Sequence, residues 1–591
     1  MYRRPELDLS GYTGEPSLRT PLICPNFHRF CSDPHSSEYN MSLKMPLAPN
    51  AGLFKQGYSA MSNADGAILR NALAVREISL MVATLMGPLG RNKIIVNKHG
   101  KIFVTNDAAT MLQELEIVHP VVKILMQALK QQEFEMGDNT NYVIVLAGEL
   151  LTIAEKLVTI GLLVSEIIQG YQIAVKHVVA LLDSLVVDEA KLLTDDAELE
   201  KVIKPVILAK QYANEPLITK LVVEAVKFIL NPQKPQLFNI DNVRVVKIMG
   251  ASLRQLEVVK GMVFPREPEG LVKNITERLK VVVFTTPIDI TTTETKGTVL
   301  LHNAQEMLDF SAGEEAQMDQ MCKEIYDSGV RVVIAGSTVG DLALHYMNKY
   351  GLLVLKVPSK FDVRRICQVC GATPLPRLGA PTPDEMGVID VIETKEIGGD
   401  RVTIVRQNEL VLRTLTIVIR GATQNNLDDV ERAIDDGVNA IKGLLKDARL
   451  LAGAGAVEAD LVNLVTKKGE TTAGVMQLAI KHFAKAFEVI PRVLSETAGA
   501  DAAEFLSKLY AAHSEDTEDA KCAGIDIDND EVGDIRQLGI YDLLATKKLA
   551  IELAVEATCT ILLIDQIIMA KRAGGPVMPQ QPRPGNWDQD D

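Results

Sequence analysis

Apolar residues in the first third of the chain recur every three or four positions, the spacing of a helix with one buried face. Between residues 64 and 86 the repeating positions are Ile68, Ala72, Val75, Ile78, Val82 and Leu85. Gly87 and Pro88 follow, and because proline cannot continue the hydrogen-bond ladder we expect the helix to end there. Apolar patterning also predicts helices over residues 142–161 and 162–187.

Short strands and loops separate these helices. The runs 93–97 and 101–105, with Lys98-His99-Gly100 between them, predict a hairpin. Asn106 and Asp107 then precede a predicted helix at Ala108, where a short acidic or amide side chain is a favoured cap.

The centre of the chain alternates between strand and helix. Strand-like runs cover residues 243–249, 281–285, 330–335, 352–357, 401–405 and 412–420. A helix is predicted over 314–328 and a proline-rich loop over 372–383, and long helices return until a last one at 547–569. This pattern predicts an α/β region inserted into a helical body to which both chain ends contribute.

The two ends of the sequence differ from the rest. Residues 1–40 show no periodicity and no apolar core of a secretory signal, so we expect a disordered extension, or an upstream start that adds no structure. Residues 574–591 are rich in Pro, Gly, Gln and Asp and predict a disordered tail.

Composition narrows the class of protein. The chain has 591 residues, enough for about three to five domains at ~100–200 residues each, and 47% hydrophobic with 24% charged residues is typical of a globular protein. The net charge of −15 argues against nucleic acid or an anionic membrane as the main partner. No apolar run reaches the roughly 18 residues of a membrane-spanning helix.

Two short patterns suggest metal chemistry but are better explained otherwise. The seven cysteines are scattered, which fits free thiols in a reducing compartment, and the Cys367/Cys370 pair lacks the second pair or histidines of a zinc site. Asp526, Asp528 and Asp530 resemble the start of a calcium loop, but Glu531 and Gln537 occupy the positions that need Gly and Glu. We interpret the first as incidental spacing and the second as a solvated acidic loop.

Three glycine loops precede helices, and the common nucleotide-binding and hydrolase signatures are missing. The loops are 87–90, 137–141 and 453–456. A helix N-terminus favours phosphate, Asp138 suits a phosphate that arrives with Mg²⁺, and the Thr140 hydroxyl can donate to a phosphate oxygen. Each loop alone is better explained as a turn with a helix cap.

Together, the motifs resemble the group II chaperonins in order and spacing over residues 41–575. They are Gly87–Gly90, Thr105–Thr110, Gly137–Asn141, Arg420–Thr423, Glu431–Asp436 and Gly453–Gly455. Residues 50–55, 370–379 and 583–587 are similar to one subunit type of the eukaryotic cytosolic chaperonin TRiC/CCT.

The resemblance implies a multi-domain fold. It implies a mainly α-helical equatorial domain from residues 41–188 and 450–573, and a small α/β intermediate domain from 189–250 and 413–449. An α/β apical domain would span 251–412, with a helical lid protrusion at about 291–313. Two stacked rings of eight paralogous subunits would use ATP to enclose and fold cytosolic proteins such as actin and tubulin, in the cytoplasm, without nucleic acid or membrane.

The same resemblance implies roles for individual residues. ATP or ADP with Mg²⁺ would be bound through Asp138 as the metal ligand, and Asp107 and Asp436 would orient and deprotonate the attacking water. The residues implied to contact the nucleotide are Gly87, Pro88, Gly137, Asn139, Thr140, Asn141, Lys210 (sensing the γ-phosphate), Gly453, Gly455 and Asp542.

Structural explanations exist for several of these residues. Asp107 could act only as a helix cap, and Lys210 could be a surface lysine. Asp436 points away from the apolar stripe of its predicted helix, at ~100° per residue, so a solvated face is its default. Asp435 stands where the family usually has His, which leaves two candidates for one role.

The motifs also depart from the family pattern. The loop usually written G-D-G-T-T has Asn139 and Asn141, Ala454 replaces the middle of three glycines, and Ala108 replaces a glycine. Leu89 and Asn92 replace a basic and an acidic residue. The changes at Asn139, Asn141 and Ala454 favour a second hypothesis, a structural ring subunit that binds nucleotide with little or no hydrolysis. A third hypothesis, a free-standing small-molecule kinase or ATPase, is disfavoured because the chain lacks any acceptor-binding motif.

Overall fold

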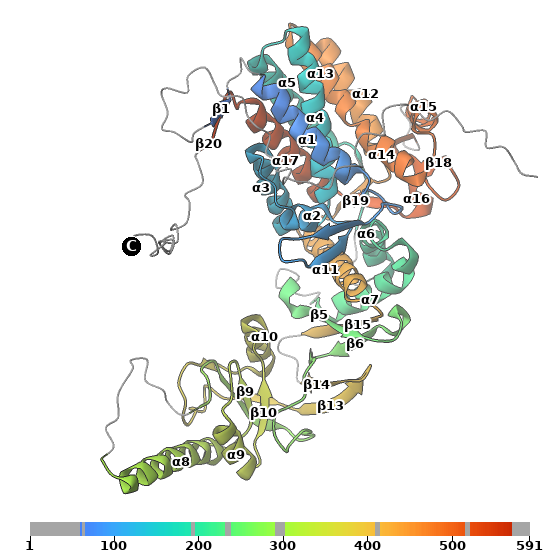
Figure 1. Ribbon diagram of the computed structural model, residues 1–591. Helices are drawn as coiled ribbons and strands as arrows, with labels where there is room; N and C mark the ends of the chain where they lie inside the picture. Colours follow the sequence, from blue (N-terminus) through green and yellow to red (C-terminus); the bar gives the residue numbers. More distant parts are fainter. Residues whose placement is uncertain are drawn as a thin grey trace, which may run out of the picture. The chain divides into compact units, whose positions relative to one another are not determined.

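The computed structural model describes residues 59–61, 66–190, 195–230, 238–289, 302–407, 414–514 and 520–569 (Figure 1). The predicted N-terminal extension and C-terminal tail lie outside these residues. By its contacts the chain divides into two units, one of residues 1–61 with 568–591 and one of residues 62–567. Strands β1 (Ser59–Met61) and β20 (Ile567–Met569) form a two-stranded sheet, and the remaining elements belong to the second unit.

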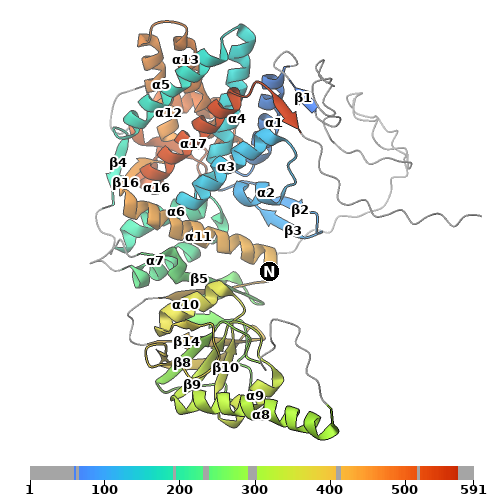
Figure 2. The same cartoon turned by 90° about the vertical axis from the view of Figure 1, so that its left-hand side faces the viewer.

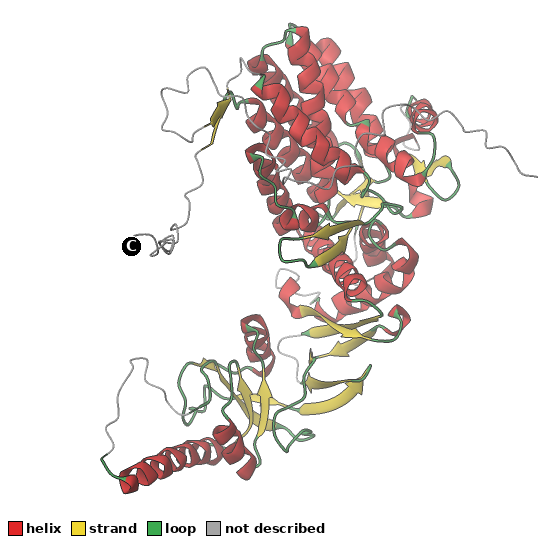
Figure 3. Ribbon diagram, viewed as in Figure 1, coloured by secondary structure: helices red, strands yellow, loops and turns green. Residues whose placement is uncertain are grey.

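A helical body contains segments from both halves of the sequence (Figures 1 and 3). Its central helix, α4, has residues buried along its whole length and contacts helices α1 and α17, and α5 contacts α13 and α17. The helices are α1 (Ala67–Ala83), α2 (Ala108–Glu114), α3 (Pro120–Glu135), α4 (Thr140–Ile160), α5 (Val164–Leu182), α12 (Ala456–Thr471), α13 (Met476–Ala486), α14 (Val489–Ala498), α15 (Ala502–Ala512), α16 (Ile535–Leu538) and α17 (Leu544–Leu562).

Three small sheets belong to this part of the chain. The predicted hairpin forms as the antiparallel pair β2 (Lys93–Val96) and β3 (Ile102–Thr105). Strands β17 (Ala523–Asp526) and β18 (Glu531–Asp534) form a second antiparallel pair. Strand β16 (Arg449–Ala452) lies between β4 (Val186–Glu189) and β19 (Tyr541–Leu543), so three distant segments meet in one sheet.

A three-stranded sheet is packed against helices by a continuous apolar cluster. Strand β15 (Leu415–Gly421) runs parallel to β5 (Val243–Met249) and antiparallel to β6 (Glu257–Lys260). Three helices supply the other apolar side chains of the cluster: α6 (Asp196–Leu208), α7 (Glu215–Ile229) and α11 (Gln424–Lys446). The apolar stripe expected for α11 is confirmed, because Leu427, Val430, Ile434, Val438 and Ile441 are buried and Leu445 is partly buried against the same cluster.

The inserted α/β region has helices on both faces of one sheet, as the two views in Figures 1 and 2 agree. Strands β8 (Leu279–Phe284), β9 (Val330–Ala335) and β10 (Leu353–Lys356) are parallel, with β11 (Pro374–Leu375) and β12 (Gly387–Ile389) beside β8. Helices α8 (Ala304–Asp327) and α9 (Asp341–Lys349) cover one face, and α10 (Lys360–Cys370) covers the other. Strands β7 (Met262–Phe264), β13 (Val391–Ile397) and β14 (Asp400–Arg406) form a further sheet.

Short 3₁₀ turns complete the described elements. They are η3 (Tyr212–Asn214), η5 (Ile240–Asn242), η6 (Leu253–Gln255) and η7 (Ala520–Cys522).

Four element boundaries differ from the sequence prediction. The helix predicted over 162–187 ends at Leu182, and Val186–Glu189 forms strand β4. Helix α8 begins at Ala304, ten residues before the predicted start. The helix continues through Gly313, because a glycine inside a helix lowers its stability by only ~1 kcal/mol. Residues 304–313 of the predicted lid protrusion are therefore helical, and residues 290–301 lie outside the described part. The last helix ends at Leu562, and Ile567–Met569 forms strand β20 instead. The loop predicted over 372–383 contains the short strand β11.

The crossing of α1 and α4 depends on a glycine. A Cβ added at Gly148 of α4 would overlap the Ser79 side chain of α1. We predict that Gly148→Ala lowers the stability of the purified native protein by about 1–3 kcal/mol, the usual cost of overpacking a core. Thermal unfolding measures the change. Gly313→Ala in α8, where a Cβ meets no atom within 4 Å, is the control and should not destabilise; equal melting of both variants would contradict the prediction.

Candidate functional site

Asp107 caps helix α2 and also contacts the following glycine loop. Its Oδ2 accepts hydrogen bonds from the Thr110 backbone N–H and hydroxyl, both at 2.9 Å, as expected of a cap. Its Oδ1 accepts a bond of 2.9 Å from the Thr140 hydroxyl. The cap interpretation is therefore correct but incomplete, because the carboxylate also binds the first residue of α4. Thr140, predicted to donate to phosphate, donates to Asp107 here.

The second glycine loop ends at the N-terminus of α4. Gly137 and Asn139 have φ values of 77° and 64°, so Asn139 adopts the left-handed conformation that a glycine would favour. A Cβ at Gly137 would lie 2.5 Å from the Cβ of Asn439 on α11. Gly137 is needed because α11 passes this close to the loop.

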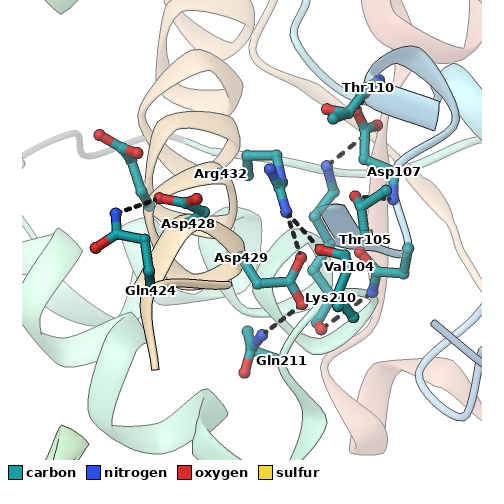
Figure 4. Close-up of polar contacts among 12 residues, drawn as sticks. Val104, Thr105, Asp107, Thr110, Lys210, Gln211, Gln424, Asp428, Asp429 and Arg432 are labelled. Carbon is teal, nitrogen blue, oxygen red and sulfur yellow. Dashed lines mark hydrogen bonds and ion pairs between the residues drawn. The ribbon is translucent and has the colours of Figure 1, made fainter. Parts of the chain in front are cut away.

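Lys210 joins two of the predicted catalytic carboxylates. Its ammonium pairs with Asp436 Oδ2 on α11 and lies 3.7 Å from Asp107 Oδ1, the contact drawn in Figure 4. Asp436 is only 9% exposed and Asp107 6%, so the default expectation of a solvated face for Asp436 is wrong. The side of α11 opposite its apolar stripe is covered by residues from the first half of the chain, which periodicity within one helix cannot predict.

Arg432 ties the same helix to strand β3. Its Nη2 donates to the Val104 carbonyl at 3.1 Å and to Asp429 Oδ1 at 2.9 Å. The other oxygen of Asp429 accepts a bond of 3.3 Å from the Gln211 side chain (Figure 4). One turn before Asp436, α11 is thus attached both to the strand that leads to Asp107 and to the residue after Lys210.

A cavity of about 620 Å³ opens beside these groups, within the ~300–1,000 Å³ typical of small-molecule sites. Of the predicted nucleotide contacts, all but Gly137 and Gly453 line it: Gly87, Pro88, Asp138, Asn139, Thr140, Asn141, Lys210, Gly455 and Asp542. Gly453 instead donates its backbone N–H to the Ile540 carbonyl, and Gly137 faces α11. Asp107 and Asp436 are not among the residues that line the cavity, but both contact Lys210, which does line it.

The carboxylates around the cavity differ in their proton affinity. Burial raises the pKa of Asp107, but Lys210, Thr110 and Thr140 outweigh it, and the pKa of Asp107 lies below its ordinary value. Burial raises the pKa of Asp138, and the charges of Asp542 and Asp107 raise it further, against the opposing effects of Lys210 and the Asn139 N–H. A cation at Asp138 would offset this excess of negative charge.

The far wall of the cavity contains a buried ion cluster that the sequence does not reveal. Lys547 is 3% exposed, and its Nζ lies 2.6 Å from both Asp542 Oδ2 and Glu458 Oε1 and 5.0 Å from the Tyr142 ring centre. In the sequence Lys547 marks only the start of a predicted helix. Its partners are separated from it by five and eighty-nine positions, so no local spacing identifies the cluster.

Residues at the mouth of the cavity are also missing from the sequence prediction. Tyr212 donates a hydrogen bond of 2.5 Å to Asp528, and both line the cavity together with Asp526 and Ile527. Asp526 is buried, and its Oδ1 accepts from the backbone N–H groups of Asp528 and Asn529. The acidic loop is therefore solvated only at its tip, since Asp526 holds the turn between β17 and β18.

The cysteine pair of the sequence lies on α10. Cys367 and Cys370 are buried free thiols, and burial raises the pKa of Cys367 to about 11 and that of Cys370 further. Among the residues that the structure describes, no three His, Cys, Asp or Glu side chains are grouped as metal ligands. Nor does any helix in those residues have the length and apolar character needed to cross a membrane.

Comparison with known proteins gives consistent matches. Residues 78–572 match the TCP-1/cpn60 chaperonin family. The T-complex protein 1 subunit theta of Candida albicans is 64% identical over 551 residues, that of Saccharomyces cerevisiae 60% over 570, and that of Homo sapiens 45% over 553. Each match covers 93% of this chain and all of the relative.

Asp435 and Asp436 play different parts although they are adjacent. Asp436 pairs with Lys210, whereas Asp435 is exposed on α11, where partial desolvation and the nearby charge of Glu431 raise the pKa of its carboxyl. The folded state therefore holds this proton more tightly than the unfolded state, and the stability it contributes is complete below about pH 4 and is lost as the pH rises to about 7.

We predict that Asp435→Asn, which cannot ionise, melts at a higher temperature than the native protein above pH 6. Because Asp435 is exposed and solvent screens its charge, the advantage should stay below about 1 kcal/mol in total and level off above pH 7. Thermal unfolding between pH 5.5 and 8.5 measures it. Asp530→Asn, the same change at an exposed turn, is the control; a Tm difference for Asp435→Asn that does not change with pH would show that the carboxyl ionises freely.

Proposed function

Because the chain belongs to the TCP-1/cpn60 chaperonin family, we propose that it is a ring subunit of a hetero-oligomeric chaperonin and that it binds and hydrolyses ATP. The resemblance deduced from the motifs is confirmed by the family match and by the relatives, whose names include subunit theta, the subunit type to which residues 50–55, 370–379 and 583–587 pointed. The relatives' name, T-complex subunit, supports paralogous partners.

The observation that carries the proposed hydrolysis is that Lys210 links two carboxylates to a cavity that a third carboxylate lines. Asp107, Asp138 and Asp436 come from three separate segments, and Lys210 contacts two of them and lines the same cavity as the third. Phosphoryl transfer needs positioning and charge neutralisation more than a strong base. A buried carboxylate with a lowered pKa, such as Asp107, is ionised at neutral pH and can accept a hydrogen bond from an attacking water.

The residues present fit ATP with Mg²⁺. Residues at the start of α4 line the cavity, and the free N–H groups of a helix N-terminus favour phosphate. Asp138 would hold Mg²⁺, since its pKa is raised by burial and by neighbouring carboxylates, and one carboxylate suffices when phosphates and waters complete the shell. Bound Mg²⁺ would supply neutralisation of the phosphate charge. Asp542, held in place by Lys547, would accept from the ribose hydroxyls.

In this mechanism the chain's own residues orient a water molecule. Asp107 and Asp436 lie on either side of Lys210, so one ammonium holds both carboxylates at the same place. Asp107 would accept the proton of the water, and Lys210 would stabilise charge that develops on the phosphate. Arg432 attaches α11 to β3 and so keeps Asp436 in position.

The wider role follows from the family and is part of the proposal. Hydrolysis would drive closure of a lid formed by the inserted α/β region over non-native proteins such as actin and tubulin, in two stacked rings of eight subunits in the cytoplasm. The equatorial, intermediate and apical boundaries given from the sequence remain predictions.

A second function, a structural subunit with little or no hydrolysis, is favoured by residues 137–141, the proposed phosphate loop. Asn139 presents a side chain where a glycine would let the backbone approach phosphate closely, and Ala454 has a positive φ of 50° beside Gly455. The two functions are separated by one measurement, the loss of γ-phosphate from nucleotide bound at this subunit.

We predict that Asp436→Asn slows hydrolysis at this subunit by about 100-fold or more, the range of a lost catalytic carboxylate, and leaves nucleotide binding nearly unchanged. The native complex, purified through a tag on this chain, is loaded with 8-azido-ATP carrying ³²P in either the α or the γ position and then photolysed. The α label on this chain measures occupancy, and the ratio of γ to α label measures the unhydrolysed fraction.

The neighbouring substitution Asp435→Asn is the matched control and should hydrolyse at the native rate at pH 7.5. Native-like loss of γ label in Asp436→Asn would remove Asp436 from the mechanism. Retention of γ label in the unmodified chain after prolonged incubation would instead establish the structural subunit.

A further inference from the structure

The side-chain amide of Asn141 binds the backbone on both sides of Asp107. Its Oδ1 accepts a hydrogen bond of 2.9 Å from the Ala108 N–H, and its Nδ2 donates one of 3.2 Å to the Asn106 carbonyl. Because one neighbour offers a donor and the other an acceptor, only one orientation of the amide satisfies both. We propose that Asn141 is a positioning residue for Asp107 and not a phosphate ligand, a role that rests on the proposed hydrolysis.

The first turn of α4 therefore holds Asp107 at three points. Thr140 donates to the carboxylate, and Asn141 binds the peptide groups before and after it. The same chain of contacts continues to Lys210, because Asn106 Nδ2 donates to the Lys210 carbonyl at 3.2 Å. The helix that begins at the phosphate loop thus sets the position of the base and of its lysine partner.

A phosphate contact would require Asn141 to give up these bonds. Ala108 is the first residue of α2, and its N–H has no partner within that helix. Ala108 is fully buried, so turning the amide toward the cavity would leave this N–H without an acceptor, at about 1–3 kcal/mol. Asn141 contributes to the cavity wall through a side chain that is already engaged.

The two bonds need an amide. A carboxylate at position 141 could accept from Ala108 but could not donate to Asn106, and a hydroxyl offers one oxygen where the amide offers two separate atoms. As a departure from the family pattern, Asn141 is an argument for weak hydrolysis. Its two hydrogen bonds to the backbone instead orient Asp107, the predicted base. The effect of losing it should appear in the hydrolysis step and not in nucleotide affinity.

The test uses the native complex purified through a tag on this chain, with Asn141→Ala and Asn141→Asp, and 8-azido-ATP labelled in the α or γ position as the probe. We expect occupancy curves within about twofold of the unmodified chain for Asn141→Ala. The rate of γ-label loss at saturating nucleotide should fall by about 10- to 100-fold, as expected when a reacting group is displaced by about 1 Å.

Asn141→Asp keeps the side-chain shape and provides a second measurement if Asn141→Ala assembles poorly. Its new carboxylate beside Asp107 should raise the pKa of that base. The pH profile of γ-label loss should therefore move to higher pH, which a purely structural defect would not produce.

The outcomes separate this proposal from the function on which it rests. Weaker occupancy with an unchanged rate at saturation would identify Asn141 as a phosphate ligand and overturn the proposal, as would two variants indistinguishable from the unmodified chain. If the unmodified chain itself retains its γ label, hydrolysis at this subunit is excluded and the positioning role falls with it.

Discussion

The site depends on one partly buried cation, which contacts acids from two parts of the chain. Lys210 contacts Asp107, which begins α2, and Asp436, which lies on α11. Two buried carboxylates repel each other, and removing the partner of a buried charge costs about 3–5 kcal/mol. Lys210 therefore does more than lower the pKa of Asp107: it makes the approach of Asp436 on α11 to Asp107 electrostatically possible. Arg432 acts in the same direction, because it binds the Val104 carbonyl and Asp429 at once.

Close packing is the second condition for this arrangement. Asn439 occupies the space that a side chain at Gly137 would need, and Ser79 occupies the space beside Gly148. The first contact brings α11 onto the loop of residues 137–141, and the second brings α1 onto α4, the helix that begins at that loop. Charge pairing selects which segments meet, whereas glycine determines how closely they meet. A site assembled from three distant segments needs both, since its polar contacts act over about 3 Å.

The parts of the site that depend on local sequence could be predicted, and the parts that depend on packing between segments could not. The Asp107 cap, the β2–β3 hairpin and the loop at Asn139 follow from side-chain chemistry within a few residues. The burial of Asp436 could not follow from α11 alone, because its cover comes from Lys210, 226 positions earlier. The ion pairs of Lys547 with Glu458 and Asp542 could not be predicted for the same reason. The boundary of α8 was missed because one glycine inside a helix resembles a helix end.

The departures from the family pattern take on a different meaning once their contacts are known. Asn139 and Ala454 keep the left-handed backbone conformation that glycine would adopt, at a strain of about 1–3 kcal/mol each. The backbone of both loops therefore keeps the path that glycine would give it. Asn141 goes further, since its amide replaces a small hydroxyl with two bonds around Asp107. A sequence that had lost the need for hydrolysis would have no reason to hold the predicted base from both sides. The contacts around Asp107, more than the motif letters, favour a chain that turns over its nucleotide.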